Sequence, residues 1–236
     1  GLRWGDRIGK GIRIAPRDAL AADSVSPENR GLAFGLHRAM DSLGAMIGIL
    51  IAAAVVWGAQ SNSLKLSRAS FQTIALFSMA PAFLAVLTLA VGSKDVAVKG
   101  RRALPKFVLR GLGKPFLTFL AIISVFTLGN SSDAFLILRA QNLGVSVLGI
   151  LIMLAVFNLI YALASTPAGS LSDRVGRRRL IIGGWLAYAA IYLGFALARA
   201  GWQIWLLYVL YGLYYALAYG STHAIVADLV SENLRG

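Results

Sequence analysis

Long apolar runs constrain the fold of this chain more than any other feature of its sequence. A helix that crosses the hydrocarbon core of a bilayer needs about 20 consecutive, predominantly apolar residues. Six stretches are apolar over about this length, namely 31–57, 71–92, 116–138, 146–168, 180–198 and 202–222. The more polar stretch 1–23 counts as a partial seventh. Because each has the length of a helix rather than a strand, the sequence predicts an all-α membrane protein, a multi-span helical bundle.

The composition excludes several classes of protein. Hydrophobic residues make up 58% of the chain and charged residues 14%, whereas soluble domains average roughly 45–50% and 25%. The chain has no cysteine, which excludes disulfides and cysteine-ligated metals. We find no metal-ligand cluster, no nucleophile triad, and no phosphate loop in a strand–loop–helix context. We therefore expect a membrane protein without cofactor, metal or enzymatic activity.

The positions of the basic residues predict how the helices are oriented. The loops near 24–30, 93–115, 173–179 and 231–236 hold 13 Lys and Arg, and the opposite loops hold four. The positive-inside rule places the first set in the cytoplasm. The net charge of +13 is then mainly an orientation signal, and nucleic acid is not needed as a partner. We expect a multi-pass protein of the cytoplasmic membrane.

One connection is much longer than the others. Residues 93–115 are basic and separate two groups of apolar runs. We therefore expect an N-terminal bundle over 1–92, a cytoplasmic basic linker over 93–115, and a C-terminal bundle over 116–236.

A repeated stretch relates these two groups. ALAADSVSPENRG at 19–31 and AIVADLVSENLRG at 224–236 share seven of 13 residues without a gap. The two copies are separated by six predicted membrane passages, so they lie on the same face of the membrane. An even number of passages predicts a parallel repeat about an axis along the membrane normal. The alternative is that both copies are simply favourable turns.

The segment GSLSDRVGRR at 169–178 resembles the G-x-L-x-D-R-x-G-R-R loop of the major facilitator superfamily. In that family the loop joins the second and third helices of a six-helix half. The resemblance implies a partial twelve-helix major-facilitator fold made of two six-helix halves. The chain is then expected to run from helix four to the end of helix ten, without helices one to three, eleven and twelve.

The resemblance also implies a function. Members of the family are secondary active transporters that move a small solute by alternating access. The motif is thought to lock the cytoplasmic gate, a role carried over here to Gly169, Asp173, Arg174, Gly176 and Arg177. Arg178 and the following Arg179 are open to a plainer interpretation as topology anchors.

The predicted first helix carries a charged face. At about 100° per residue, its charged side chains fall within roughly an 80° arc, and they are Arg3, Asp6, Lys10, Arg13 and Arg17. Charges in a membrane segment usually face a bundle interior or water. We expect this face to line a substrate cavity, which favours an anionic substrate. The alternatives are internal neutralisation by carboxylates and an amphipathic helix in the membrane interface.

The next helix holds a candidate for proton coupling. His37 and Asp41 share one face, and histidine titrates near neutrality. The alternative is an ion pair among Asp41, Arg38 and the preceding helix. Gly44 and Gly48 on the same face permit close helix packing. The family's exporters carry G-x-x-x-G-P at this point, and here Ile49 replaces the proline, which leaves the direction of transport open.

The second half is less polar. Asn130 and Asp133 belong to the polar side of the seventh helix, and Tyr211 and Tyr215 to a tyrosine stripe on the tenth. These four residues complete the predicted cavity, although an aromatic stripe is also typical of helix packing.

Together these observations predict a transporter of the cytoplasmic membrane, coupled to an ion or proton. We expect a monomer in the bilayer with a small-molecule substrate, and the sequence leaves open the export of an anionic or drug-like compound. The alternative is a multi-span membrane receptor or scaffold that does not transport.

Overall fold

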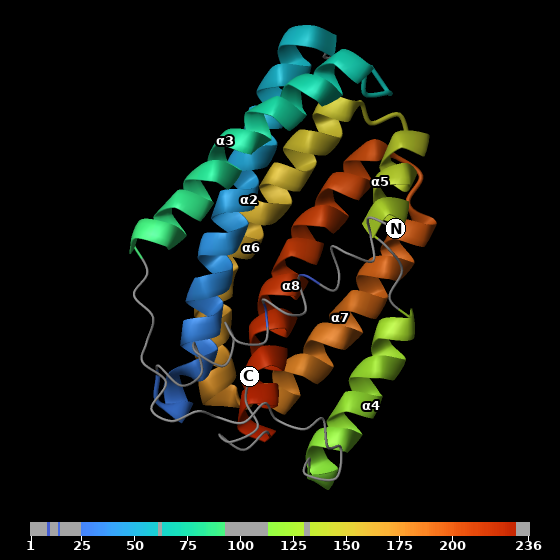
Figure 1. The fold of residues 1–236 in the computed structure, drawn as a ribbon. Helices are drawn as coiled ribbons and strands as arrows, with labels where there is room; N and C mark the ends of the chain where they lie inside the picture. The colour runs from blue at the N-terminus through green and yellow to red at the C-terminus, as the bar shows by residue number, and fades with distance from the viewer. Residues whose placement is uncertain are drawn as a thin grey trace.

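The computed structural model describes residues 9, 14, 25–60, 63–92, 113–129 and 133–229, and all regular structure within them is helical. A short turn of 3-10 helix, Pro27–Asn29, precedes the first long helix. The helices are α2 (Arg30–Gln60), α3 (Arg68–Gly92), α4 (Lys114–Gly129), α5 (Asp133–Asn142), α6 (Val147–Val175), α7 (Arg177–Leu197) and α8 (Gly201–Leu229). Figure 1 shows them as one elongated bundle, which confirms the predicted fold class.

Within these ranges, five segments are long and apolar enough to cross a membrane. They are Arg30–Gln60, Arg68–Thr88, Lys114–Asn142, Val147–Val175 and Arg177–Leu197. The third comprises α4 and α5, and residues 130–132 lie outside the described part of the chain. Helix α8 is not among the five, although it is 29 residues long.

Helix α6 lies at the centre of the packing. Helix α2 runs antiparallel along it, α8 packs against both, and α7 packs against α8. The beginning of α2 at Arg30 and the end of α6 at Val175 lie side by side, at the predicted cytoplasmic face (Figure 1). The most extensive contact of α2 is therefore with a helix on the other side of the predicted linker. The division into bundles 1–92 and 116–236 stays a prediction.

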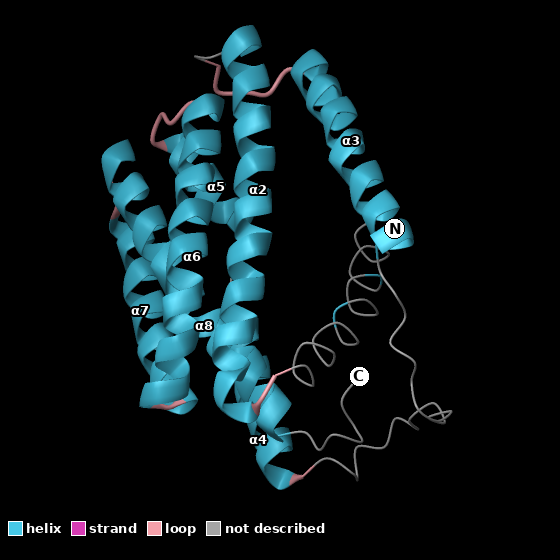
Figure 2. Ribbon diagram, turned by 90° about the vertical axis from the view of Figure 1, so that its left-hand side faces the viewer, coloured by secondary structure: helices cyan, strands magenta, loops and turns pink. Residues whose placement is uncertain are grey.

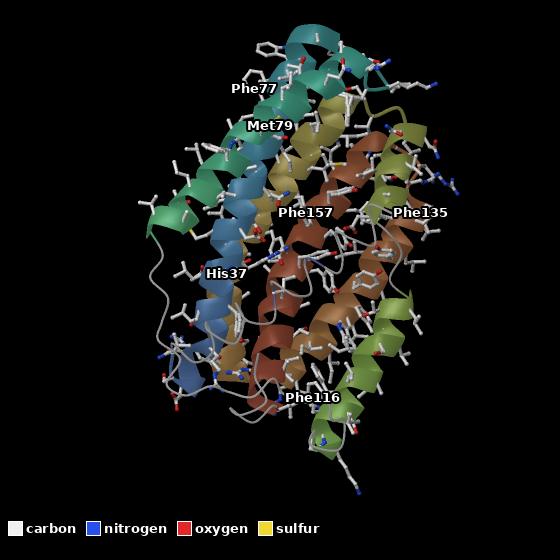
Figure 3. All side chains as sticks on the ribbon, viewed as in Figure 1. His37, Phe77, Met79, Phe116, Phe135 and Phe157 are labelled. Atoms are coloured by element: carbon white, nitrogen blue, oxygen red, sulfur yellow. The ribbon has the colours of Figure 1, made fainter. Side chains whose placement is uncertain are left out.

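Helix α3 stands apart from the other helices. It meets α2 near the turn that joins them and then diverges from it (Figure 2). Phe77 and Met79 project from α3 away from the bundle (Figure 3), and their side chains are 60% and 65% exposed. An exposed apolar surface of this kind is what a lipid-facing helix requires.

Glycines allow α2 and α6 to touch through their backbones. A methyl group added at Gly35 would lie 2.5 Å from the carbonyl oxygen of Ser165. One added at Gly31 would lie 2.6 Å from the carbonyl oxygen of Gly169. Small residues at four-residue spacing on both helices permit this close approach in a membrane protein. We call the contact of Gly31 and Gly35 with Ser165 and Gly169 the α2–α6 crossing.

The close approach differs from the one that the sequence suggested. Gly44 and Gly48 lie further along α2 and are exposed, and a methyl group added at either would meet no described atom within 4 Å. The same four-residue spacing thus occurs twice in α2, and the copy nearer its beginning makes the contact with α6.

Aromatic side chains fill the space between α6, α7 and α8. Tyr188, Tyr208 and Tyr211 are buried together with Phe195. Phe157 of α6 lies between α6 and α8 (Figure 3), with its ring centroid 5.7 Å from that of Tyr211. The tyrosine stripe of the tenth predicted helix therefore packs, and the hydroxyl groups of some of its members also make polar contacts.

The α2–α6 crossing predicts how two glycines respond to the same substitution. We expect Gly35→Ala to lower the free energy of unfolding by about 1–3 kcal/mol, because the new methyl group meets backbone that cannot move aside. Gly48→Ala, in open space on the same helix, should be neutral or stabilising by up to about 1 kcal/mol. Thermal unfolding of the purified variants in detergent compares the two. Equal melting temperatures would contradict the crossing.

Candidate functional site

Asp173, near the end of α6, caps the beginning of α2. Its Oδ1 accepts a hydrogen bond from the backbone N–H of Gly31 at 3.1 Å, and its Oδ2 accepts one from Leu32 at 3.0 Å. The first N–H groups of a helix have no acceptor within the helix. A carboxylate is also attracted to the positive end of the helix dipole. The N-terminus of α2 is thus satisfied by a residue 142 positions away in sequence.

Arg177 completes this contact, which we call the Asp173 cap. Its Nη2 donates to Asp173 Oδ1 at 3.1 Å, and both side chains are 12% exposed. Gly176 adopts a φ of +100° between α6 and α7, a conformation that strongly favours glycine. This turn allows α7 to start beside the end of α6, within reach of Asp173.

A second carboxylate lies beside the cap. Glu28 precedes α2 and lines a cavity of about 870 Å³ with Asp173 and Arg177. A hydrogen bond from backbone and a second from the Ser26 side chain hold the pKa of Glu28 below its usual value. Its negative charge therefore also stabilises the N-terminus of α2, the positive end of the helix dipole.

Four of the five predicted gate residues meet in this region. Gly169 belongs to the α2–α6 crossing, and Asp173, Gly176 and Arg177 form the cap and its turn. Arg174 is exposed. Their role as a gate stays a prediction.

Further along the same helices, Arg38 of α2 binds Tyr161 of α6. Its Nε donates to the Tyr161 hydroxyl at 2.5 Å, and its guanidinium carbon lies 4.7 Å from the centroid of the ring. Its Nη1 donates to Asp41 Oδ2 at 2.6 Å. Asp41 thus forms the ion pair with Arg38 that the sequence left open as an alternative. His37 is half-buried on α2 (Figure 3), and its role in proton coupling stays a prediction.

Three of the predicted cavity residues come together around one hydroxyl group. Tyr211 donates to Asp133 Oδ1 at 2.8 Å. Its hydroxyl oxygen lies 3.3 Å from that of Tyr215 and 3.4 Å from that of Tyr192. Tyr211 is buried, with 2% of its surface exposed, whereas Asp133 is exposed at the start of α5. The structure therefore joins a carboxylate to a group of tyrosine hydroxyls.

The remaining predicted cavity residues lie outside the described part of the chain. They are Arg3, Asp6, Lys10, Arg13, Arg17 and Asn130. Their role in a substrate cavity stays a prediction.

The sequence did not single out Arg38 as a site residue. Its signal was the three-residue spacing to Asp41, which favours an ion pair on one helix. The contact with Tyr161 had no such signal, because the two residues lie 123 positions apart in the chain.

The family model of the major facilitator superfamily matches residues 2–236, the region that includes the Asp173 cap. The chain belongs to the major facilitator superfamily. This membership agrees with the membrane-spanning helices, and the superfamily consists of transporters rather than enzymes.

A relative whose name states a transporter of this type agrees with this assignment. The chain is 35% identical to an uncharacterized MFS-type transporter of Methanocaldococcus jannaschii, over 98% of this chain and 57% of that protein. Uncharacterized proteins of Mycobacterium bovis and Mycobacterium tuberculosis are 39% identical over 22% of this chain and 12% of their own length. The chain thus spans little more than half of the archaeal transporter. No solved structure matches it.

Two buried tyrosines of this superfamily member provide a matched test of the hydroxyl cluster. Tyr211→Phe removes the donor to Asp133, and we expect it to destabilise the protein by about 1–2 kcal/mol. The Tyr208 hydroxyl is buried and has no hydrogen-bond partner among the described residues. Tyr208→Phe should therefore be neutral or slightly stabilising. The melting temperatures of the two variants in detergent test this expectation. A larger loss of stability in Tyr208→Phe than in Tyr211→Phe would refute the hydroxyl cluster.

Proposed function

We propose that this chain belongs to a secondary active transporter that moves a small solute across the cytoplasmic membrane by alternating access. The observation that carries the proposal is the Asp173 cap. It ties the beginning of α2, which precedes the predicted linker, to the end of α6, which follows it. A contact between the two predicted halves at the cytoplasmic face is what a gate requires.

The strength of the cap suits a contact that breaks and re-forms. A helix N-cap contributes about 0.5–2 kcal/mol, and the ion pair between Asp173 and Arg177 joins neighbouring turns of the same half. A ligand shifts such an equilibrium only by its differential affinity for the two states. Because the cap contributes so little, modest differential binding is sufficient to open it.

Coupling and substrate are proposed from the charged residues. His37 and Asp41 are the candidates for coupling to a proton, since both lie on α2 near the Arg38 contact. The cationic face of residues 1–18 favours an anionic solute. We further propose that the protein acts as a monomer in the cytoplasmic membrane.

A receptor or scaffold in the membrane is the alternative, and it differs in one measurable respect. Such a protein would keep the α2–α6 crossing closed, whereas a transporter must open it toward the cytoplasm. Ser165 is part of the crossing and is 2% exposed. Its accessibility therefore distinguishes a transporter from a receptor or scaffold.

We expect Ser165→Cys to react slowly but measurably with a membrane-impermeant maleimide in inside-out vesicles. These 236 residues contain no other cysteine, and any cysteine elsewhere in the full-length protein is replaced by serine beforehand, so labelling reports this position alone. Adding Asp173→Asn should raise the labelling rate about fivefold, the effect of about 1 kcal/mol lost from the cap. Protein abundance should change little, because folding rests on helix packing.

Arg179→Gln is the control, because Arg179 is an exposed arginine next to the cap. It should leave the rate unchanged. If Ser165→Cys never reacts in either background, the crossing does not open and the receptor or scaffold is favoured. Equal rates with and without Asp173→Asn would show that the cap is not part of a gate.

A further inference from the structure

The Arg38 guanidinium lies within the predicted membrane-spanning region. Its partner Tyr161 lies on α6 (Val147–Val175), seven residues before the predicted cytoplasmic end of the apolar run at residue 168. Seven helical residues rise about 10 Å, so the contact lies about that far inside the predicted span. A cation at this depth must meet water, a counter-ion or a ligand.

A row of tyrosines connects this cation to a carboxylate. The ring centroid of Tyr161 lies 5.6 Å from that of Tyr215. The Tyr215 hydroxyl lies 3.3 Å from the Tyr211 hydroxyl, which donates to Asp133 at 2.8 Å. The row thus has a positive group at one end and a negative group at the other.

The two ends of the row differ from its middle in their exposure. The side chains of Arg38 and Asp41 are 25% and 55% exposed, and Asp133 is exposed. Tyr161 and Tyr211 are buried, at 1% and 2%. The buried tyrosines therefore fix the positions of the two ends, and a ligand can reach the charged groups themselves.

We infer that this row binds a substrate that carries both an anionic and a cationic group. Arg38 binds the anionic group and Asp133 binds the cationic group, and the tyrosines between them hold the two ends in place. The inference rests on the proposed transport function and names the substrate class for it. The row brings together residues of α2, α5, α6 and α8, so the substrate contacts helices on both sides of the predicted linker. Substrate sites at the bilayer midplane between repeats are general among secondary transporters.

Asp41 acts as the counter-ion of the empty site. It holds Nη1 of Arg38 at 2.6 Å, the place that the anionic group of the substrate takes. Asp41 can then turn to water, because more than half of its side chain is exposed. Arginine suits this exchange, since its planar fork of donors matches a carboxylate or phosphate.

Charge complementarity excludes simpler ligands. A dianion would place its second negative group against Asp133, and a diamine would place a positive group against Arg38. Juxtaposed like charges are strongly unfavourable at a desolvated site. Only a molecule with one group of each sign matches both ends of the row.

Three matched probes test this class. They are 5-aminopentanoate, glutarate and 1,5-diaminopentane, which share a five-carbon chain and differ in the signs of their end groups. Shorter and longer ω-amino acids accompany them. Binding to the purified full-length protein is measured as a concentration-dependent rise in melting temperature.

We expect one or more ω-amino acids to stabilise the protein, and glutarate and the diamine to have no comparable effect. Arg38→Gln and Asp133→Asn should each weaken the apparent affinity at least about tenfold, the loss of one charged hydrogen bond. Arg38→Lys, which keeps the charge, should bind more tightly than Arg38→Gln even if it destabilises the fold. Arg199→Gln, at an exposed arginine between α7 and α8, should bind as the parent does.

The proposal is overturned if no ω-amino acid stabilises the protein, or if glutarate or the diamine stabilises it equally. It is also overturned if Arg38→Gln and Asp133→Asn bind as the parent does. This readout needs no movement of the gate, so it is separate from the labelling of Ser165→Cys. Binding without labelling would refute transport and leave the substrate site standing. Labelling without binding would refute the substrate site and leave transport standing.

Discussion

The contact on which the rest of the structure depends is the backbone contact between α2 and α6 at Gly31, Gly35 and Gly169. Any side chain larger than hydrogen at these positions would meet carbonyl oxygens of the opposite helix. With the two backbones this close, Asp173 reaches the first N–H groups of α2. The same antiparallel register brings Arg38 onto Tyr161, within the predicted membrane-spanning region.

The extensive contact between α2 and α6 rests on close backbone packing, with few polar bonds. Apolar side chains gain little free energy by exchanging contact with lipid for contact with another helix, so helices in a membrane associate through close packing and hydrogen bonds. The α2–α6 crossing supplies the packing, and the Asp173 cap supplies a few polar bonds at one end. Most of the buried aromatic surface instead joins α6, α7 and α8 to one another. In the gate that we propose, α2 moves relative to α6 while the α6–α7–α8 group stays together.

Much of this could be predicted from the sequence, and the exceptions have physical reasons. Apolar run length predicted the helices, because the bilayer imposes a minimum length on each. The motif at 169–178 singled out Asp173, but its partners Gly31 and Leu32 could not be inferred, because tertiary contacts over 142 residues leave no local signal. The same limit hid the contact between Arg38 and Tyr161. Four-residue glycine spacing occurs twice in α2, and spacing alone does not say which pair meets another helix.

The measurement that tests the account most directly is the distance between spin labels on α2 and α6 in lipid nanodiscs. Leu36 and Leu171 are exposed, at 54% and 41%, and lie on the two helices near the crossing. Double electron–electron resonance should give two populations of distances, the shorter one matching the crossing, and Asp173→Asn should enlarge the longer one. A single short distance, unchanged by Asp173→Asn, would contradict the claim that this contact opens.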